Sequence, residues 1–126
     1  MSIKVFGPYS PVKSAPSCST IFFVAGQVGV DENGNAPENF QDQFELVIKN
    51  LDRVLESQNL SLRNIINLRV YLTDMADFIK LNQLFEKYFT GISPSRECIG
   101  VQALPPVAKN GVKLKVEISA VAARDQ

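Results

Sequence analysis

Arg96 is the residue whose type and setting point most directly to ligand chemistry. It follows the segment Ser93-Pro94-Ser95 and opens a predicted strand, because proline favours extended backbone around it. A guanidinium held at the end of a sheet is always charged and can grip a carboxylate through two parallel hydrogen bonds. A surface arginine in a salt bridge is the ordinary alternative, and Arg96 by itself favours that alternative.

Cys98 and Tyr9 are two further candidates for a functional role. Cys98 comes two residues after Arg96, so both side chains share one face of the predicted strand. As a nucleophile this thiol would lack a histidine partner, so we expect a small, half-buried strand residue. Its backbone polar groups could still line a site. Tyr9 lies in the loop segment Gly7-Pro8-Tyr9-Ser10; such loops often carry function, although a plain turn residue is the alternative.

Asn82 and Glu117 are the other polar candidates. Asn82 falls inside the apolar stripe of a helix predicted over residues 76–89. A buried amide must be hydrogen-bonded, so Asn82 either braces a loop, which is the commoner role, or faces a ligand. Glu117, on the last predicted strand, is the one carboxylate that we expect on the sheet beside Arg96, and pairing with a lysine of the same strand is the alternative.

The elements that must hold these residues alternate between strand-like and helix-like patterns in one domain, residues 1–126. Helices are predicted over residues 40–55, where apolar residues form one continuous stripe, and over residues 76–89, with Asp74 as N-cap. Strands are predicted at residues 3–6, 20–25, 67–73, 96–103 and 112–122, with residues 28–30 extending or pairing with the second of these. We therefore expect an α/β (α+β) fold: a single mixed sheet of about six strands, in the order β-β-α-β-α-β-β, with two helices on one face.

Turn residues mark where these elements end. Asp31-Glu32-Asn33-Gly34 predicts a turn of hairpin type. Asn59 is a plausible stop for the first helix, and Ser61 caps a brief turn that runs through Ile65.

One face of this sheet is left without a cover. Two helices can cover only one face, yet the strand at residues 20–25 is apolar on both sides. Because an exposed apolar face is unusual, we expect the second face to be buried against other copies of the chain. A lone α/β sandwich with a wet face is the less favoured alternative.

The composition excludes several function classes. The chain has no histidine and two cysteines, which rules out Ser-His-Asp and Cys-His nucleophile pairs and a tetrahedral Cys/His zinc site. Thirteen basic and thirteen acidic residues cancel, which disfavours nucleic-acid binding. No signal peptide and no membrane span are evident, so we expect a cytoplasmic protein with reduced cysteines.

Five segments, in one order along nearly the whole chain, resemble the YjgF/RidA family of reactive-intermediate imine/enamine deaminases, some relatives of which are named endoribonuclease L-PSP. They are Gly7-Pro8-Tyr9-Ser10; Ala25-Gly26-Gln27-Val28; Met75-Ala76-Asp77-Phe78 leading to Asn82 and Tyr88-Phe89; Pro94-Ser95-Arg96-Glu97-Cys98 with Val101 and Leu104-Pro105; and Val116-Glu117-Ile118-Ser119-Ala120-Val121-Ala122. No single segment is specific to the family, but the five segments together are.

The resemblance implies a homotrimer with a chorismate-mutase-like fold, in which the sheets form a central barrel and the helices lie outside. It places ligand sites in clefts between subunits, where Arg96 pairs with the substrate carboxylate and Cys98 contributes mainly its main chain. The catalytic residues implied in this way are Arg96 and Cys98, and the substrate-binding residues are Tyr9, Gly26, Asn82, Arg96, Glu117 and Ser119.

The implied reaction is hydrolysis of 2-imino acids, such as 2-iminobutanoate and 2-iminopropanoate, and of their enamine tautomers to 2-oxo acids and ammonia. These substrates arise from pyridoxal-phosphate-dependent dehydration of serine or threonine, but this chain is itself expected to need no cofactor and no metal. A protonated imine is already a strong electrophile, so a carboxylate clamp and an oriented water can serve without histidine.

Two positions depart from the family pattern. Deaminases of the main branch usually carry a second glutamate two residues after the one that matches Glu117, where this chain has Ser119, and often a serine where this chain has Ala25. These departures motivate an alternative, a non-catalytic trimer that binds small carboxylic acids as a sensor or regulator. A ribonuclease or translation inhibitor is a third hypothesis, which neutral charge and the absence of histidine disfavour.

Overall fold

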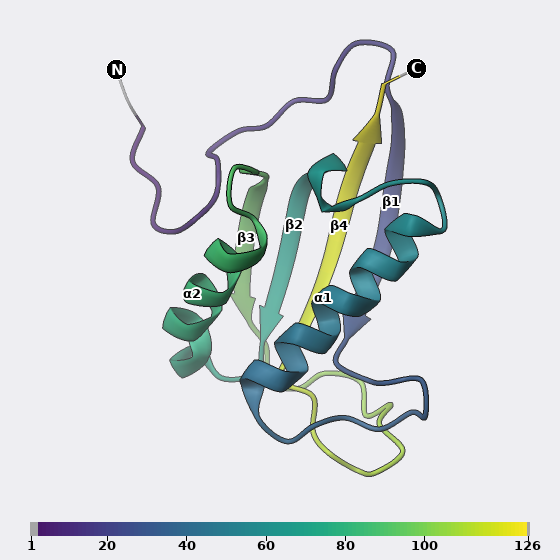
Figure 1. Ribbon diagram of the computed structural model, residues 1–126. Helices are drawn as coiled ribbons and strands as arrows, with labels where there is room; N and C mark the ends of the chain where they lie inside the picture. The colour runs from purple at the N-terminus through teal and green to yellow at the C-terminus, as the bar shows by residue number, and fades with distance from the viewer. Residues whose placement is uncertain (1–2, 126) are drawn as a thin grey trace.

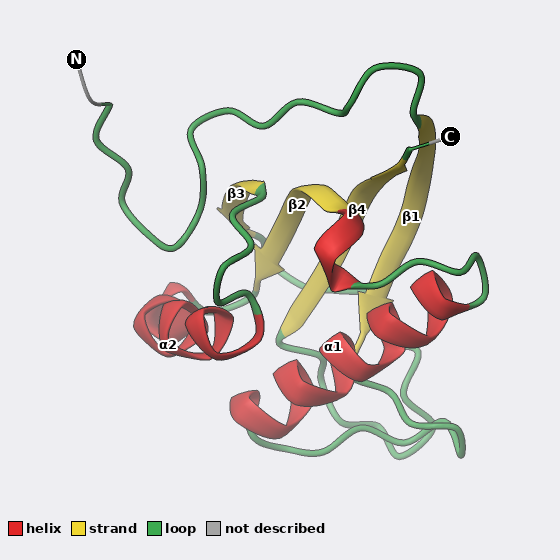
Figure 2. Cartoon of the chain, turned by 45° about the horizontal axis from the view of Figure 1, so that its top comes forward, coloured by secondary structure: helices red, strands yellow, loops and turns green. Residues whose placement is uncertain are grey.

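One sheet of four strands carries both helices on the same face (Figure 1; Figure 2). The computed structural model describes residues 3–125. The strands are β1 (Thr20–Val28), β2 (Ile65–Leu72), β3 (Ser95–Gly100) and β4 (Val116–Arg124), in the spatial order β1-β4-β2-β3. β4 runs antiparallel to both of its neighbours, whereas β2 and β3 are parallel. The mixed sheet with two helices is confirmed, but the expected count of about six strands is wrong within the described residues.

The two helices begin and end at residues suited to those positions. In α1 (Phe40–Glu56) the N-cap Asn39 accepts a hydrogen bond from the Asp42 backbone, and the chain leaves the helix through Asn59 at a φ of 59°. α2 (Phe78–Tyr88) follows a short 3₁₀ turn, Met75–Asp77, that Asp74 caps. Within residues 3–125, no helix has the length and apolar character that a bilayer crossing requires.

The helix-covered face of the sheet and the apolar stripes of the helices form the core. Phe44, Val47 and Leu51 of α1 are fully buried, and so are the inward residues of β2 and β4. These inward residues alternate along their strands, as a sheet buried on one face requires. They are Leu68, Val70 and Leu72 in β2 and Val116, Ile118, Ala120 and Ala122 in β4.

The predicted strand at residues 3–6 is absent. This segment is irregular, and Ile3 and Phe6 are more than two-thirds exposed, at 73% and 72%. Among the described residues, the N-terminal segment meets the sheet through a single bridge, Ser10 to Ser95 at the outer edge of β3. Since only Ser10 pairs with the free edge of β3, residues 3–6 have no partner strand, and their apolar pattern does not produce a strand.

Side chains from α1 explain why two other predicted strand segments are irregular. Gln43, which is fully buried, donates to the backbone oxygens of Pro37 and Lys113 and accepts from the Lys115 backbone, so β4 begins only at Val116. Asn50 donates to the backbone oxygens of residues 28 and 30, so β1 reaches Val28 and residues 29 and 30 lie outside it. Elsewhere, β3 ends at Gly100 rather than at residue 103, and the turn at residues 31–34 leads toward α1 rather than into a hairpin.

The face of the sheet that the helices leave open carries exposed apolar side chains. Phe23 of β1 is 83% exposed and Ile21 is 41% exposed. The expectation that two helices cover one face of the sheet is confirmed, and burial of the other face against further copies stays a prediction.

Candidate anion-binding site

Arg96 is held on the buried face of β3, beneath α2. It lies opposite Leu68 of β2, so its side chain shares the helix-covered face, and only 8% of the residue is exposed. The guanidinium carbon lies 5.1, 5.8 and 5.0 Å from the ring centres of Tyr9, Phe78 and Phe85. Three aromatic rings therefore surround the charge and stabilise it through cation–π contacts.

Polar atoms without partners gather at this arginine. Among the described residues, the buried side-chain nitrogens and oxygens that lack a hydrogen bond are Nε and Nη1 of Arg96 and Oδ1 of Asn82. Burial lowers the pKa of the Arg96 guanidinium from its usual value, and the neighbouring Cys98 and Tyr9 oppose the shift; an arginine nevertheless stays protonated at neutral pH. A buried, unpaired cation is costly, and a carboxylate that accepts from two guanidinium nitrogens would remove that cost. The salt-bridged surface arginine that the sequence favoured for Arg96 alone is not what the structure contains.

Tyr9 and Asn82 reach the arginine from different elements. The segment of residues 7–10, which we call the strap, turns so that the Tyr9 backbone donates to the Gly7 oxygen at 2.9 Å. A Cβ atom placed on Gly7 would lie 3.0 Å from Arg96 Nη2, 3.2 Å from Tyr9 Cε2 and 3.3 Å from Asn82 Oδ1. The three side chains thus converge at one point, although they come from the N-terminal loop, α2 and β3.

Cys98 lies on the same sheet face as Arg96, as the sequence spacing predicts, and is half-buried. Burial raises the pKa of the Cys98 thiol, and the charge of Arg96 opposes that shift only in part. The neutral thiol therefore predominates near pH 7, which does not suit a nucleophile. β3 is also an edge strand whose outer side, past Ser95, has no strand partner among the described residues, so its backbone groups can meet a ligand.

Glu117 does not lie beside Arg96, contrary to expectation. It is opposite Tyr71 of β2 and Val28 of β1, and it therefore points to the open face of the sheet. Ser119, two residues on, shares that face. A Cβ placed on Gly26 would lie 2.8 Å from the Glu117 carboxyl carbon, so this carboxylate rests against the glycine of β1.

The expected site residues therefore form two groups on opposite faces. Tyr9, Asn82, Arg96 and Cys98 are together on the helix-covered face, and Gly26, Glu117 and Ser119 are on the open one. The register explains the division, because Arg96 and Glu117 have opposite parity relative to β2. The alternative of a Glu117–lysine ion pair is also absent from the described residues, whose ion pairs are Arg69–Glu97 and Lys87–Glu45.

Phe78 and Phe85 are site residues that the sequence analysis placed only in the core stripe of the second helix. Phe78 lies four residues before Asn82 and Phe85 lies three residues after it, so all three share one helix face. An amide between two aromatic residues on one helix face is the sequence signal that could have placed them in the site.

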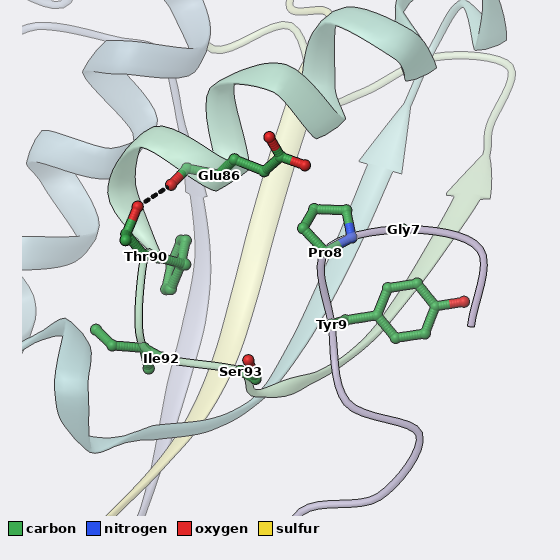
Figure 3. A pocket seen from close by; sticks show the side chains of 8 residues that line it. Gly7, Pro8, Tyr9, Glu86, Thr90, Ile92 and Ser93 are labelled. Atoms are coloured by element: carbon green, nitrogen blue, oxygen red, sulfur yellow. Dashed lines mark hydrogen bonds between the residues drawn. The ribbon is translucent and has the colours of Figure 1, made fainter. Parts of the chain in front are cut away.

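A hollow of about 440 Å³ lies between the strap and the end of α2 (Figure 3). Residues of the strap and of the chain around the end of α2 line it: Gly7, Pro8, Tyr9, Glu86, Phe89, Thr90, Ile92 and Ser93. The Tyr9 ring is directed away from Thr90 and Ile92. Within residues 3–125, no three His, Cys, Asp or Glu residues are grouped so that they could hold a metal ion.

Comparison with known proteins agrees with this arrangement. The family model described as endoribonuclease L-PSP matches residues 1–124. A RutC family protein of Aquifex aeolicus is 35% identical over 117 residues, which cover 90% of each chain. Reactive Intermediate Deaminase A, chloroplastic, of Arabidopsis thaliana is 32% identical over 118 residues, or 92% of this chain and 58% of the plant protein. The crystal structure of E. coli TdcF with bound serine is similar at a TM-score of 0.75 and 31% identity, over 96% of this chain and 91% of that one. The chain belongs to the YjgF/RidA family, whose members include reactive intermediate deaminases.

Proposed function

We propose that this protein hydrolyses small 2-imino acids and their enamine tautomers to 2-oxo acids and ammonia. The observation that carries the proposal is the buried Arg96 guanidinium, two of whose nitrogens have no partner. A small carboxylate, whose two oxygens can accept from one edge of a guanidinium, is a ligand that suits this cation. That E. coli TdcF was crystallised with serine, itself a small carboxylate, supports a ligand of this size.

The residues around Arg96 supply positioning rather than covalent chemistry. Arg96 holds the substrate carboxylate, so the adjacent imine carbon lies near the Cys98 stretch of β3. Water adds to the carbon of the protonated C=N bond, and one of its protons passes to the nitrogen. The C–N bond then breaks to release ammonia, which takes up the remaining hydroxyl proton as ammonium and leaves the 2-oxo acid. Fixing an electrophile that is already reactive next to a water lowers the entropic part of the barrier.

A second copy of the chain completes this proposed site. Glu117 and Gly26 lie on the open face, so they can join an Arg96 site only when they belong to a neighbouring subunit. The exposed Phe23 and Ile21 support burial of that face between copies. We therefore propose a homotrimer with sites between subunits, as the family resemblance implies.

A coupled assay tests the activity. Threonine dehydratase generates 2-iminobutanoate, and release of 2-oxobutanoate is followed with and without the purified protein. We expect the parent to accelerate release and Arg96→Ala to abolish the acceleration. Arg63→Ala, an exposed arginine away from the site, is the matched control and should behave as the parent. No acceleration by the parent, or full activity in Arg96→Ala, contradicts the proposal.

A non-catalytic carboxylate binder is the second candidate. Ser119 supports it, because this position on the open face lacks the carboxylate that main-branch deaminases carry there. Calorimetry with 2-oxobutanoate distinguishes the two functions: binding that depends on Arg96, without turnover in the coupled assay, favours the binder.

A further inference from the structure

We propose that Gly7 and Ser10 are positioning residues that set the distance between the strap and Arg96. This inference rests on the proposed function, in which Arg96 binds the substrate carboxylate. Neither residue needs to react or to contact the reacting atoms. Both act through Tyr9 and Arg96.

Gly7 is a glycine for reasons of space. Its φ is not in the left-handed region, unlike those of Gly34, Gly91 and Gly111, so backbone conformation does not require a glycine there. The space around Gly7 is too small for a side chain, because a Cβ would lie 3.0 Å from Arg96 Nη2 and 3.3 Å from Asn82 Oδ1. Any larger residue would have to displace the arginine, the asparagine or the strap itself.

The arginine cannot readily yield to such a side chain. Its guanidinium is enclosed by the rings of Phe78 and Phe85 on α2 as well as by Tyr9, and the side chain is buried. The strap has more freedom, because a hollow of about 440 Å³ lies between Pro8 and the end of α2 (Figure 3). A methyl group on Gly7 is therefore expected to push the strap into this space and to carry the Tyr9 ring away from Arg96.

Ser10 ties the strap to the strand that carries Arg96. Its backbone N–H donates to the Pro94 oxygen at 3.0 Å, its hydroxyl donates to the Ser93 oxygen, and it forms a parallel bridge with Ser95. These contacts fall on the residues immediately before Arg96. Gly7 thus allows the close approach and Ser10 maintains it, which gives the two residues one shared function.

Calorimetric titration with 2-oxobutanoate tests the inference. We expect Gly7→Ala to bind about tenfold more weakly, which is the order of one cation–π contact, because the displaced Tyr9 ring no longer supports the Arg96 guanidinium. Ser10→Ala keeps the backbone contacts and loses one hydrogen bond, so we expect binding about threefold weaker. Ser10→Thr retains the hydroxyl and should restore the parent affinity. Val12→Ala, at a 79% exposed position just beyond the strap, is the control.

The outcomes separate positioning from general stability and from failure of the proposed function. The urea midpoint of each variant should equal that of the parent, and in the coupled assay KM should rise while kcat changes little. Equal affinity in the parent, Gly7→Ala and Ser10→Ala overturns this inference and leaves the proposed function intact. If the parent binds no 2-oxobutanoate and shows no turnover, both fall. If Gly7→Ala fails to fold, the affinities of Ser10→Ala and Ser10→Thr for 2-oxobutanoate are compared instead, and equal affinities overturn the inference.

Discussion

Arg96 and Glu117 lie on opposite faces of the same sheet. Arg96 pairs with Leu68 and points toward α2, whereas Glu117 pairs with Tyr71 and points to the face without helices. Within one chain, the sheet itself lies between these two charges. If both act on one substrate, they must come from two copies, and this geometry leads to the first two predictions.

Replacing Phe23 by glutamate should dissociate the assembly. This side chain is 83% exposed on the open face, and a carboxylate buried there without a partner would be strongly unfavourable in an interface. Sedimentation should give three times the chain mass for the parent and a lower mass for Phe23→Glu. Val12→Glu, which adds the same charge at an exposed position off the sheet, should sediment like the parent. A parent that sediments as a monomer contradicts the prediction.

Two inactive variants should complement each other when mixed. Arg96→Ala lacks the carboxylate clamp and Glu117→Ala lacks the group supplied by the neighbour, so each homotrimer should be inactive. If each site takes one residue from each of two copies, refolding equal amounts together leaves about a quarter of the sites with both native residues. The coupled assay should recover activity near that fraction. A mixture as inactive as its components indicates that Arg96 and Glu117 do not act on one substrate across an interface.

Local patterns predicted the two helices and the buried faces of the strands well, and the number and ends of the strands poorly. The stripe of α1 and the shared face of Arg96 and Cys98 depend only on spacing along one element, and both predictions are confirmed. Alternation along β4 is enough to put Glu117 on the face opposite to Val116 and Ile118. Which face Arg96 takes depends on the register of β3 against β2, which no pattern within either strand contains. The strand ends near residues 30 and 115 were missed because Gln43 and Asn50, both on a distant helix, take the backbone groups that a longer strand would need.

Gln43→Leu should destabilise the fold although leucine suits a buried helix position. The substitution leaves the Lys115 N–H and the backbone oxygens of Pro37 and Lys113 without their present partner. A buried polar group without a hydrogen-bond partner lowers the free energy of unfolding by about 1–3 kcal/mol. Urea unfolding should show a lower midpoint for Gln43→Leu than for the control Gln41→Leu, which changes an exposed residue of the same helix. Equal midpoints would mean that water replaces the lost contacts.

Ser119→Glu tests whether the departure from the family pattern limits turnover. Ser119 lies on the open face beside Glu117, so a carboxylate there would join the part of the proposed site that the neighbouring copy supplies. We expect a rise in kcat in the coupled assay with little change in the affinity for 2-oxobutanoate, because Arg96 is untouched. Ser119→Gln adds the same length without the charge and should not raise kcat. If kcat of Ser119→Glu equals that of the parent, position 119 does not limit the reaction.

The Cys98 thiol should react slowly with alkylating agents, and its replacement should leave turnover nearly unchanged. Burial raises its pKa, so the thiolate, which is the reactive form, becomes abundant only at pH values above the ordinary thiol range. At pH 7.5 iodoacetamide should therefore alkylate the exposed Cys18 faster than Cys98, as mass spectrometry of the two peptides can measure. The alkylation rate at Cys98 should continue to rise with pH beyond the ordinary thiol range, because burial raises its pKa. In the coupled assay Cys98→Ala should retain kcat within a few-fold, because the backbone of β3 and the Arg96 clamp remain. Loss of turnover in Cys98→Ala together with fast alkylation of Cys98 at neutral pH would instead assign the thiol a direct chemical role.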